Sequence, residues 1–176
     1  MDKKRILIYG AGAIGRWFLA PTFYNLGYEI YFVDKDASLV NELKKRKEYR
    51  TAFVKNNKYI LTRVEYSGAF LLGEEDEIIN NVDLIFSCVG PGNIIEFASK
   101  LKNAKAIISF ENEAESVDKI KKISGNNNCY FGIPDVIASN YCCQKLKKID
   151  SLCLISECGN IAIEEGKFEF PEGRRT

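Results

Sequence analysis

The chain contains no histidine, and this absence excludes two common kinds of active site. A serine or cysteine nucleophile has no imidazole base to activate it, and the side chain that most often binds transition metals is missing. The cysteines do not compensate, because none forms the CxxC pair typical of zinc sites. We therefore expect no metal site, and we expect reduced, mostly buried thiols at Cys88, Cys129, Cys142, Cys143, Cys153 and Cys158.

The chain also lacks an excess of charge of either sign and any long hydrophobic run. Its 25 lysines and arginines nearly balance its 24 aspartates and glutamates, which leaves a net charge of +1. Nucleic-acid binders usually carry a clear basic excess, so neither nucleic acid nor an anionic membrane is an expected partner. No stretch approaches the roughly 20 apolar residues that span a bilayer. The first apolar run, Ile6–Tyr9, is too short for a signal peptide, so we expect a cytoplasmic protein.

What the chain does contain is an alternation of strand and helix patterns. Its 176 residues, 46% of them hydrophobic, suit one domain over residues 1–176. Apolar runs typical of buried parallel strands occur at Arg5–Tyr9, Glu29–Val33, Asp83–Val89, Ala104–Phe110 and Cys129–Ile133. Helices are expected between and after them, at Ala13–Leu26, Ala37–Arg46, Glu74–Asn81, Asn93–Leu101 and Glu111–Ile123. This order predicts an α/β fold, a doubly wound and mostly parallel Rossmann sheet.

Two regions depart from this alternation. After the second helix, a β-hairpin is expected from Glu48–Val54 and Tyr59–Tyr66, followed by a short extra strand at Ala69–Leu72. Beyond a helix predicted at Asn140–Lys148, alternating residues and turns at Gly159 and Gly166 predict an antiparallel meander built from Ser151–Glu157 and Ile161–Glu164. The sheet should therefore carry an inserted hairpin and a C-terminal antiparallel meander.

Three residues mark the limits and an interruption of the first two helices. Gly27 suits the end of the first helix, and Asp36 can cap the start of the second. Pro21 lies inside the first helix and removes a backbone N–H, at a cost of about 3 kcal/mol if nothing compensates. We expect a kink there.

The stretch YGAGAIGRW forms a glycine-rich turn between the first strand and the first helix. A GxGxxG pattern in this setting, with an acid about 20 residues later, is the dinucleotide-binding fingerprint. Asp34 closes the second strand 19 residues after Gly15 (34 − 15 = 19). We expect Gly10 to permit the tight turn, Gly12 to leave room for a pyrophosphate, and Gly15 to let the helix pack closely. The expected cofactor-binding residues of the turn are Gly10, Ala11, Gly12, Ala13, Ile14 and Gly15.

The charge at the end of the second strand indicates which cofactor to expect. Asp34 would accept hydrogen bonds from ribose hydroxyls and repel a 2′-phosphate, which favours NAD over NADP. The adjacent Lys35 weakens that preference. Arg16 either reaches a phosphate or is a solvated helix arginine, and a glycine turn without any ligand is the alternative to the whole site.

Two further clusters follow later strands, where ligands of open α/β sheets usually lie. Val89, Gly90 and Pro91, followed by Gly92, allow a close approach to the cofactor or form a simple turn. Glu111 and Asn112 follow the next strand and would lie near a nicotinamide. Asn112 either binds a substrate oxygen or caps a helix.

Together these clusters resemble the N-terminal domain of the mannitol-1-phosphate 5-dehydrogenases, in the long-chain polyol dehydrogenase family. The family's GAGNIGRGF corresponds to GAGAIGRWF at Gly10–Phe18, its acid-closed second strand to FVDKD at Phe32–Asp36, and its AVGP loop to CVGP at Cys88–Pro91. Its ENM turn corresponds to Glu111-Asn112-Glu113. Its Asp-Arg-Ile-Val-Pro run is matched only by the segment starting at Asp135, which lacks the arginine and the proline.

The resemblance implies hydride transfer between NAD and a secondary alcohol of a polyol or polyol phosphate. It also implies a catalytic lysine in a helical C-terminal domain, within a pattern of lysine, asparagine and histidine. We expect that domain to be absent from these residues, since the chain has no histidine, and the catalytic residues therefore stay unknown. The base would come from that C-terminal domain, located elsewhere on a longer chain or encoded separately. The expected partners are this separate domain or further copies of the chain in a homo-oligomer.

Three functions are open at this point. The first is the NAD-binding domain of a polyol or polyol-phosphate dehydrogenase, inactive by itself. The second is a free-standing Rossmann module that binds a nucleotide as a sensor or partner subunit, without dehydrogenase activity. The third is a different nucleotide-dependent enzyme that uses Glu111 or Asp135 as its base.

Overall fold

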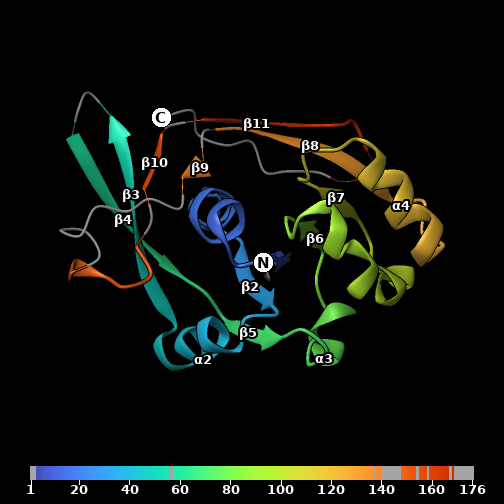
Figure 1. Ribbon diagram of the computed structural model, residues 1–176, viewed down its shortest axis with the longest axis horizontal. Helices are drawn as coiled ribbons and strands as arrows, with labels where there is room; N and C mark the ends of the chain where they lie inside the picture. Colours follow the sequence, from blue (N-terminus) through green and yellow to red (C-terminus); the bar gives the residue numbers. More distant parts are fainter. Residues whose placement is uncertain are drawn as a thin grey trace.

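Seven strands form the central sheet of the protein, in the order β11-β8-β7-β6-β1-β2-β5 (Figure 1). The computed structural model describes residues 3–55, 58–136, 138–139, 148–153, 155–157, 159–166 and 168. All pairs in this sheet are parallel except β11 with β8. The strands are β1 (Arg5–Tyr9), β2 (Glu29–Asp34), β5 (Gly68–Leu71), β6 (Leu84–Ser87), β7 (Ile107–Ser109), β8 (Cys129–Asp135) and β11 (Asn160–Ile163). The predicted doubly wound α/β sheet is thus confirmed.

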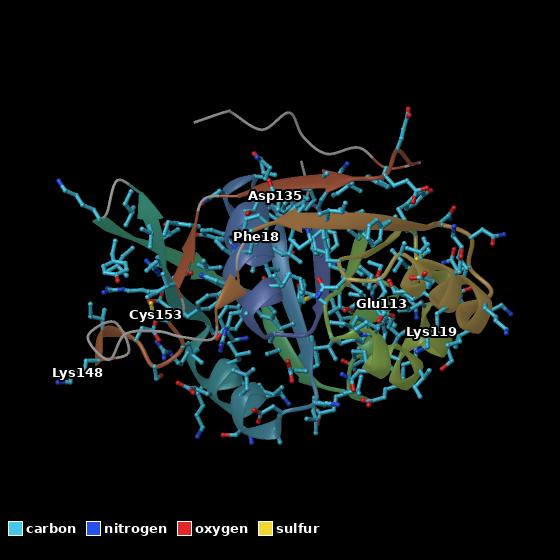
Figure 2. The ribbon with its side chains drawn as sticks, turned by 45° about the horizontal axis from the view of Figure 1, so that its top comes forward. Phe18, Glu113, Lys119, Asp135, Lys148 and Cys153 are labelled. Atoms are coloured by element: carbon cyan, nitrogen blue, oxygen red, sulfur yellow. The ribbon has the colours of Figure 1, made fainter. Side chains whose placement is uncertain are left out.

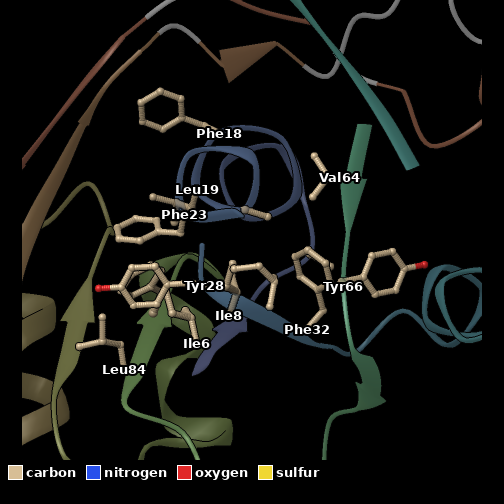
Figure 3. Packing of buried hydrophobic residues seen from close by; sticks show 14 of the residues in the cluster. Ile6, Ile8, Phe18, Leu19, Phe23, Tyr28, Phe32, Val64, Tyr66 and Leu84 are labelled. Atoms are coloured by element: carbon tan, nitrogen blue, oxygen red, sulfur yellow. The ribbon is translucent and has the colours of Figure 1, made fainter. Parts of the chain in front are cut away.

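Alternating residues of the central strands face two separate hydrophobic layers. Ile6 and Ile8 of β1 lie in one layer with the first helix, while Leu7 and Tyr9 lie in the other. Figure 3 shows Ile6 and Ile8 beside Phe23. The first layer is covered by η1 (Ala13–Leu19), α1 (Ala20–Asn25) and α2 (Ala37–Arg46), and the second by α3 (Asp76–Ile79), η2 (Pro91–Glu96), η3 (Ala98–Asn103) and α4 (Glu115–Ser124).

The first helix changes its hydrogen-bond register instead of running as a single α-helix. Its first part, η1, is π-helical, and the N–H of Ala20 bonds to the Gly15 carbonyl five residues back. In that register the Arg16 carbonyl would need the N–H of residue 21, which proline lacks. The hydroxyl of Tyr49 donates to the Arg16 carbonyl instead, so the group that Pro21 leaves without a donor is satisfied from another strand.

The caps predicted for the first two helices are present. The Asp36 carboxylate accepts hydrogen bonds from the N–H groups of Ser38 and Leu39, and α2 has the predicted bounds. Gly27 adopts φ +87° just after α1 ends. The side chain of Asp36 therefore caps α2 as the sequence indicated.

The predicted hairpin forms a second, smaller sheet with the order β4-β3-β10-β9. Its strands are β3 (Glu48–Lys55), β4 (Lys58–Glu65), β9 (Ala138–Ser139) and β10 (Ile155–Glu157). The predicted strand at Ala69–Leu72 does not join this sheet. It is shifted by one residue to Gly68–Leu71, which is β5 and pairs with β2 at the edge of the central sheet.

Each C-terminal strand has one antiparallel neighbour, as expected, but the two strands do not pair with each other as a meander. β10 pairs with β9 and also, in parallel, with β3, whereas β11 pairs with β8 of the central sheet. The chain passes from one sheet to the other around Gly159, where a Cβ would lie 2.2 Å from the Asp135 carbonyl oxygen. Alternation alone specifies which face a residue takes, not which strand lies beside it.

Several predicted boundaries differ from the structure. The single helix expected at Asn93–Leu101 is two 3₁₀ segments, η2 and η3, and the helix expected from Glu111 begins at Glu115. The strand expected at Ala104–Phe110 is limited to β7. Of the helix expected at Asn140–Lys148, residues 140–147 lie outside the described residues, as do Cys142, Cys143 and Cys158.

Two features are absent from the described part of the chain. In it, no helix combines the length and apolar character that crossing a lipid bilayer requires. The same residues contain no cluster of three or more histidine, cysteine, aspartate or glutamate side chains arranged to hold a metal ion.

Candidate dinucleotide site at the strand ends

The glycine turn follows the carboxyl end of β1, and each of its three glycines meets a different steric limit. Gly10 has φ +95°, and a Cβ there would lie 2.5 Å from the Cys88 carbonyl oxygen. At Gly15 a Cβ would lie 1.9 Å from the Gly10 carbonyl oxygen, so any side chain would push the helix off the turn. At Gly12 a Cβ would meet nothing within 4 Å. Of these three positions, only Gly12 borders open space.

The other residues of the turn place the start of the first helix beneath this space. Ala11 is fully buried, and Ala13 and Ile14 are the first residues of η1. Gly12 occupies the N-cap position without a side-chain hydrogen bond, and the first helical turn contains no acidic residue. Among the described residues, no side chain therefore caps this helix end, where an anion is favoured by the N–H groups and the dipole.

Asp34, the last residue of β2, is hydrogen-bonded to the glycine turn. Its Oδ2 accepts a hydrogen bond from the Ala11 N–H at 2.7 Å, and its Oδ1 accepts one from the Asp36 N–H at 2.9 Å. The carboxylate is half-buried and thus fixed in orientation. Each of its oxygens keeps further acceptor capacity for a ligand hydroxyl.

A cavity of about 180 Å³ opens between the ends of β1, β2 and β6. It brings together four of the predicted residues, Gly10, Gly12, Asp34 and Val89. Its apolar wall includes Tyr9 and Phe97, whose rings stack with centroids 4.2 Å apart, together with Val33 and Leu72. The cavity thus combines a largely apolar wall, a fixed carboxylate and an open glycine turn.

The Val89-Gly90-Pro91 loop is held by Glu111, a contact that the sequence did not reveal. Glu111 Oε1 accepts hydrogen bonds from the Ser87 hydroxyl at 2.7 Å and the Val89 N–H at 2.9 Å, and Oε2 accepts one from the Gly90 N–H at 2.9 Å. Only 4% of Glu111 is exposed. Its carboxylate therefore supports the loop, whereas the next residue, Asn112, is exposed to solvent.

The far side of the same loop is held from α4. Lys119 donates to the Pro91 carbonyl oxygen at 3.0 Å, and Figure 2 shows Lys119 at the same end of the molecule as Glu113. The loop after β6 is thus attached to the segments on both sides of it. The sequence pointed to this region through the Val89-Gly90-Pro91 cluster and the Glu111-Asn112 pair, each after a strand, but it gave no sign that Glu111 binds the loop.

Lys35 and Asn93 form a second pair at the site. The sequence had drawn attention to Lys35, beside Asp34, but not to Asn93 as its partner. Lys35 Nζ donates to Asn93 Oδ1 at 2.8 Å and lies 3.5 Å from Glu96 Oε1. Asn93 Nδ2 in turn donates to the Val89 carbonyl oxygen at 2.6 Å. Lys35, Asn93 and Glu96 all line the cavity, so the lysine beside Asp34 contacts η2 across the site.

Tyr9 and Cys88, which line the cavity, are held in their neutral forms. The Tyr9 hydroxyl contacts the buried Glu75 at 3.3 Å, and burial raises the pKa of Tyr9 well above its ordinary value. The Cys88 thiol donates to the carbonyl oxygens of Tyr9 and Gly10, each at 3.2 Å. Burial, together with the negative charge of Glu111, raises the pKa of Cys88 well above its usual range. Neither group is suited to act as a base or nucleophile at neutral pH.

Arg16 is not a solvated helix arginine. Only 8% of it is exposed, and burial lowers the pKa of its guanidinium. Within the described part of the chain, its Nε and Nη1 atoms have no hydrogen-bond partner. Its nearest titratable neighbours include Tyr49, Glu42 and Asp34. Contact with a phosphate stays a prediction.

Sequence comparison identifies a family model that covers most of the chain. The mannitol dehydrogenase Rossmann domain matches residues 4–138. The mannitol-1-phosphate 5-dehydrogenase of Thermoanaerobacter pseudethanolicus is 31% identical over 128 residues, which cover 70% of this chain and 31% of the relative. The enzyme of the same name from Mycoplasma pneumoniae is 26% identical over 165 residues, which cover 89% of this chain and 45% of the relative. The chain thus spans less than half the length of these curated relatives.

Comparison with solved structures supports the fold. D-mandelate dehydrogenase with NADH and anilino(oxo)acetate superposes with a TM-score of 0.61 at 20% identity, over 90% of this chain and 47% of that one. Yersinopine dehydrogenase with bound NADP⁺ gives a TM-score of 0.67 at 10% identity, over 92% of this chain and 41% of that one. The two neighbours bind different dinucleotides, so the shared fold leaves the choice between them open.

Proposed function

Since this chain belongs to the mannitol dehydrogenase family as its Rossmann domain, we propose that it binds NAD across the carboxyl ends of β1, β2 and β6. The observation that carries the proposal is the cavity in which open Gly12 and the fixed Asp34 carboxylate meet. The residues present fit a dinucleotide, because Gly12 leaves room for phosphates at an uncapped helix start and Asp34 keeps acceptors for ribose hydroxyls.

The other predicted residues then take supporting roles. Gly10 and Gly15 keep the turn tight, while Ala11 donates its N–H to Asp34 and so aligns the carboxylate. Ala13 and Ile14 present the first N–H groups of the helix. Val89, Gly90 and Pro91 would support the nicotinamide half from the loop after β6, held in place by Glu111.

NAD is proposed over NADP because Asp34 is the charged residue nearest the expected ribose. A carboxylate there repels a 2′-phosphate and accepts from the free 2′-hydroxyl. Lys35, which the sequence suggested would soften this preference, is engaged with Asn93 and Glu96. The contacts of Lys35 thus favour NAD.

We further propose that the full reaction is hydride transfer between NAD and a secondary alcohol of a polyol or polyol phosphate. When bound, the nicotinamide would accept or deliver the hydride. Asn112 is the proposed substrate-side contact, since it is exposed beyond β7. Glu111 is proposed to act only through the loop it holds, because it accepts hydrogen bonds from Ser87, Val89 and Gly90, at the end of β6 and in that loop.

The acid–base group of the reaction is proposed to come from outside these residues, in a C-terminal domain or another subunit. Support comes from the absence of histidine and from relatives more than twice as long. The neutral state of Tyr9 and Cys88 beneath the cavity also supports an acid–base group from outside these residues. Asp135, which with Glu111 was the candidate base of the third function, lies at the end of β8 beside β11, outside the cavity lining (Figure 2).

The alternative is a nucleotide-binding module without hydride transfer. It is favoured by the same observation, that the groups beneath the cavity are neutral or committed to hydrogen bonds within the chain. Both functions require nucleotide binding, and they differ in whether a base is supplied elsewhere. A reading frame that continues into a helix carrying lysine, asparagine and histidine would support the dehydrogenase.

Calorimetric titration of the purified chain with NAD and NADP tests the proposal. We expect heat of binding with NAD and a clear loss in the Gly12→Val variant, whose side chain would fill the space open at Gly12. The fold of the variant is checked by its thermal unfolding, which should change little. Absence of binding by the unaltered chain to either dinucleotide would refute the proposal.

A further inference from the structure

Lys35 directly follows Asp34, yet its ammonium is turned away from that carboxylate toward η2. Its Nζ lies 2.8 Å from Asn93 Oδ1 and 3.5 Å from Glu96 Oε1. The Asp34 oxygens instead hold the N–H groups of Ala11 and Asp36. Two neighbouring residues of opposite charge thus have different partners around one cavity. Asp34 binds the glycine turn, and Lys35 binds η2.

Asn93 connects the two cofactor loops through its side-chain amide. Its Oδ1 accepts from Lys35, and its Nδ2 donates to the Val89 carbonyl oxygen at 2.6 Å. These two bonds fix the orientation of the amide, because the oxygen must face the ammonium and the nitrogen must face the carbonyl. The amide oxygen therefore stays directed at Lys35.

The contacts of Lys35 lie at the exposed end of the cavity. The Lys35 side chain is 59% exposed and that of Glu96 is 38% exposed, and both line the cavity with Asn93. Glu96 compensates the charge of Lys35 at this position. An exposed ion pair contributes little to stability, so removing its acceptors should free Lys35 without unfolding the protein.

We propose that Lys35, held by Asn93 and Glu96, determines which dinucleotide the site accepts. With Lys35 held on η2, a 2′-phosphate would meet the Asp34 carboxylate without a compensating cation, and NADP is rejected. A released Lys35 can turn toward the ribose and offset that repulsion, which admits NADP. This inference rests on the proposed function, because it presumes that a dinucleotide occupies this cavity.

A double-mutant cycle tests the inference. Dissociation constants for NAD and NADP are measured calorimetrically for the unaltered chain, the Asn93→Ala/Glu96→Gln variant, Lys35→Ala, and the triple variant. ADP and adenosine 2′,5′-bisphosphate serve as probes of the adenosine half alone. Lys105→Ala is the matched control, since Lys105 is similarly exposed, at 64%, and pairs with Asp83 away from the cavity.

We expect the Asn93→Ala/Glu96→Gln variant to bind NADP and the bisphosphate about tenfold more tightly, the order of one charge-assisted contact. The gain should disappear in the triple variant. Any change in NAD affinity that follows from losing the Asn93 contact with Val89 should be the same in both of these variants, since both carry Asn93→Ala. Lys105→Ala should leave both affinities unaltered. An unchanged ratio of NAD to NADP affinity in the released variant, or a gain that survives loss of Lys35, would overturn the inference alone. Failure of the unaltered chain to bind any of the four ligands would overturn the proposed function as well, so the two failures are distinguishable.

Discussion

The Asp34 carboxylate accepts the Ala11 N–H at 2.7 Å, which joins the end of β2 to the glycine turn after β1. The same carboxylate is the group expected to meet a ribose. The side chain that positions the turn is therefore the same one that is proposed to meet the ribose.

Replacing Asp34 should weaken both stability and binding. Asp34→Ala leaves the buried Ala11 N–H without an acceptor, at a cost of about 1–3 kcal/mol in the free energy of unfolding, and removes the ribose acceptor. Asp34→Asn retains one acceptor oxygen and should lose less stability. Urea titrations measure the first effect and calorimetry with NAD the second. Equal stability of Asp34→Ala and the unaltered chain would show that the bond to Ala11 contributes nothing.

The glycines of the turn should respond differently to the same substitution. Gly15→Ala places a methyl group 1.9 Å from the Gly10 carbonyl oxygen and should prevent stable folding. Gly12→Ala meets no atom within 4 Å and should fold normally while binding NAD less well. Circular dichroism melts and calorimetry separate the two effects. A well-folded Gly15→Ala chain with unaltered NAD affinity would contradict the tight packing described above.

Glu111 should stabilise the Val89-Gly90-Pro91 loop through its hydrogen bonds with the backbone of Val89 and Gly90. Glu111→Ala removes the acceptor of the Val89 and Gly90 N–H groups, and each lost partner costs about 1–3 kcal/mol where the donor stays out of water. Amide hydrogen exchange at these two residues should accelerate. Glu111→Gln keeps one acceptor oxygen, so its exchange rates at Val89 and Gly90 should lie between those of the unaltered chain and those of Glu111→Ala. If exchange in Glu111→Ala matched that of the unaltered chain, the proposed support of the loop would be excluded.

The buried thiols should make stability fall at high pH. Burial raises the pKa of Cys129 to about 12, from 9.0. Because the folded-state pKa lies above the unfolded one, the stabilisation is complete below pH 9 and is lost as the pH rises toward 12. Urea titrations between pH 8 and about pH 11 should show a steeper decline for the unaltered chain than for Cys129→Ala. Parallel profiles for the two proteins would refute this assignment.

Tyr49 should replace the donor that Pro21 lacks. Tyr49→Phe leaves the Arg16 carbonyl without its hydroxyl donor and should destabilise the protein by about 1–2 kcal/mol. Pro21→Ala restores an N–H near that carbonyl, so part of the loss should return in the double variant. Chemical denaturation of the single and double variants measures the coupling between the positions. Strictly additive effects would mean that the two residues are independent.

Much of the fold followed from local patterns. The bounds of β1 and α2 agree with the sequence prediction, because a continuous apolar run and a capping aspartate act within a few residues of chain. The strand pairing of the C-terminal region did not follow from local patterns. β10 pairs with β3, more than a hundred residues earlier in the chain, and β11 pairs with β8, about thirty residues earlier. Alternation of polar and apolar residues carries no information on such partners.

The sequence by itself determined that a glycine turn and an acid would meet at the strand ends, because the order of strands and helices allows few parallel arrangements. Only the tertiary structure decided what the charged residues there do. Glu111 was expected near a nicotinamide and is buried against the Val89 loop, while Lys35 was expected to weaken the preference for NAD and is held by Asn93. Their roles depend on hydrogen-bond partners from other strands, and those partners are set by the packing of the whole sheet rather than by any local pattern.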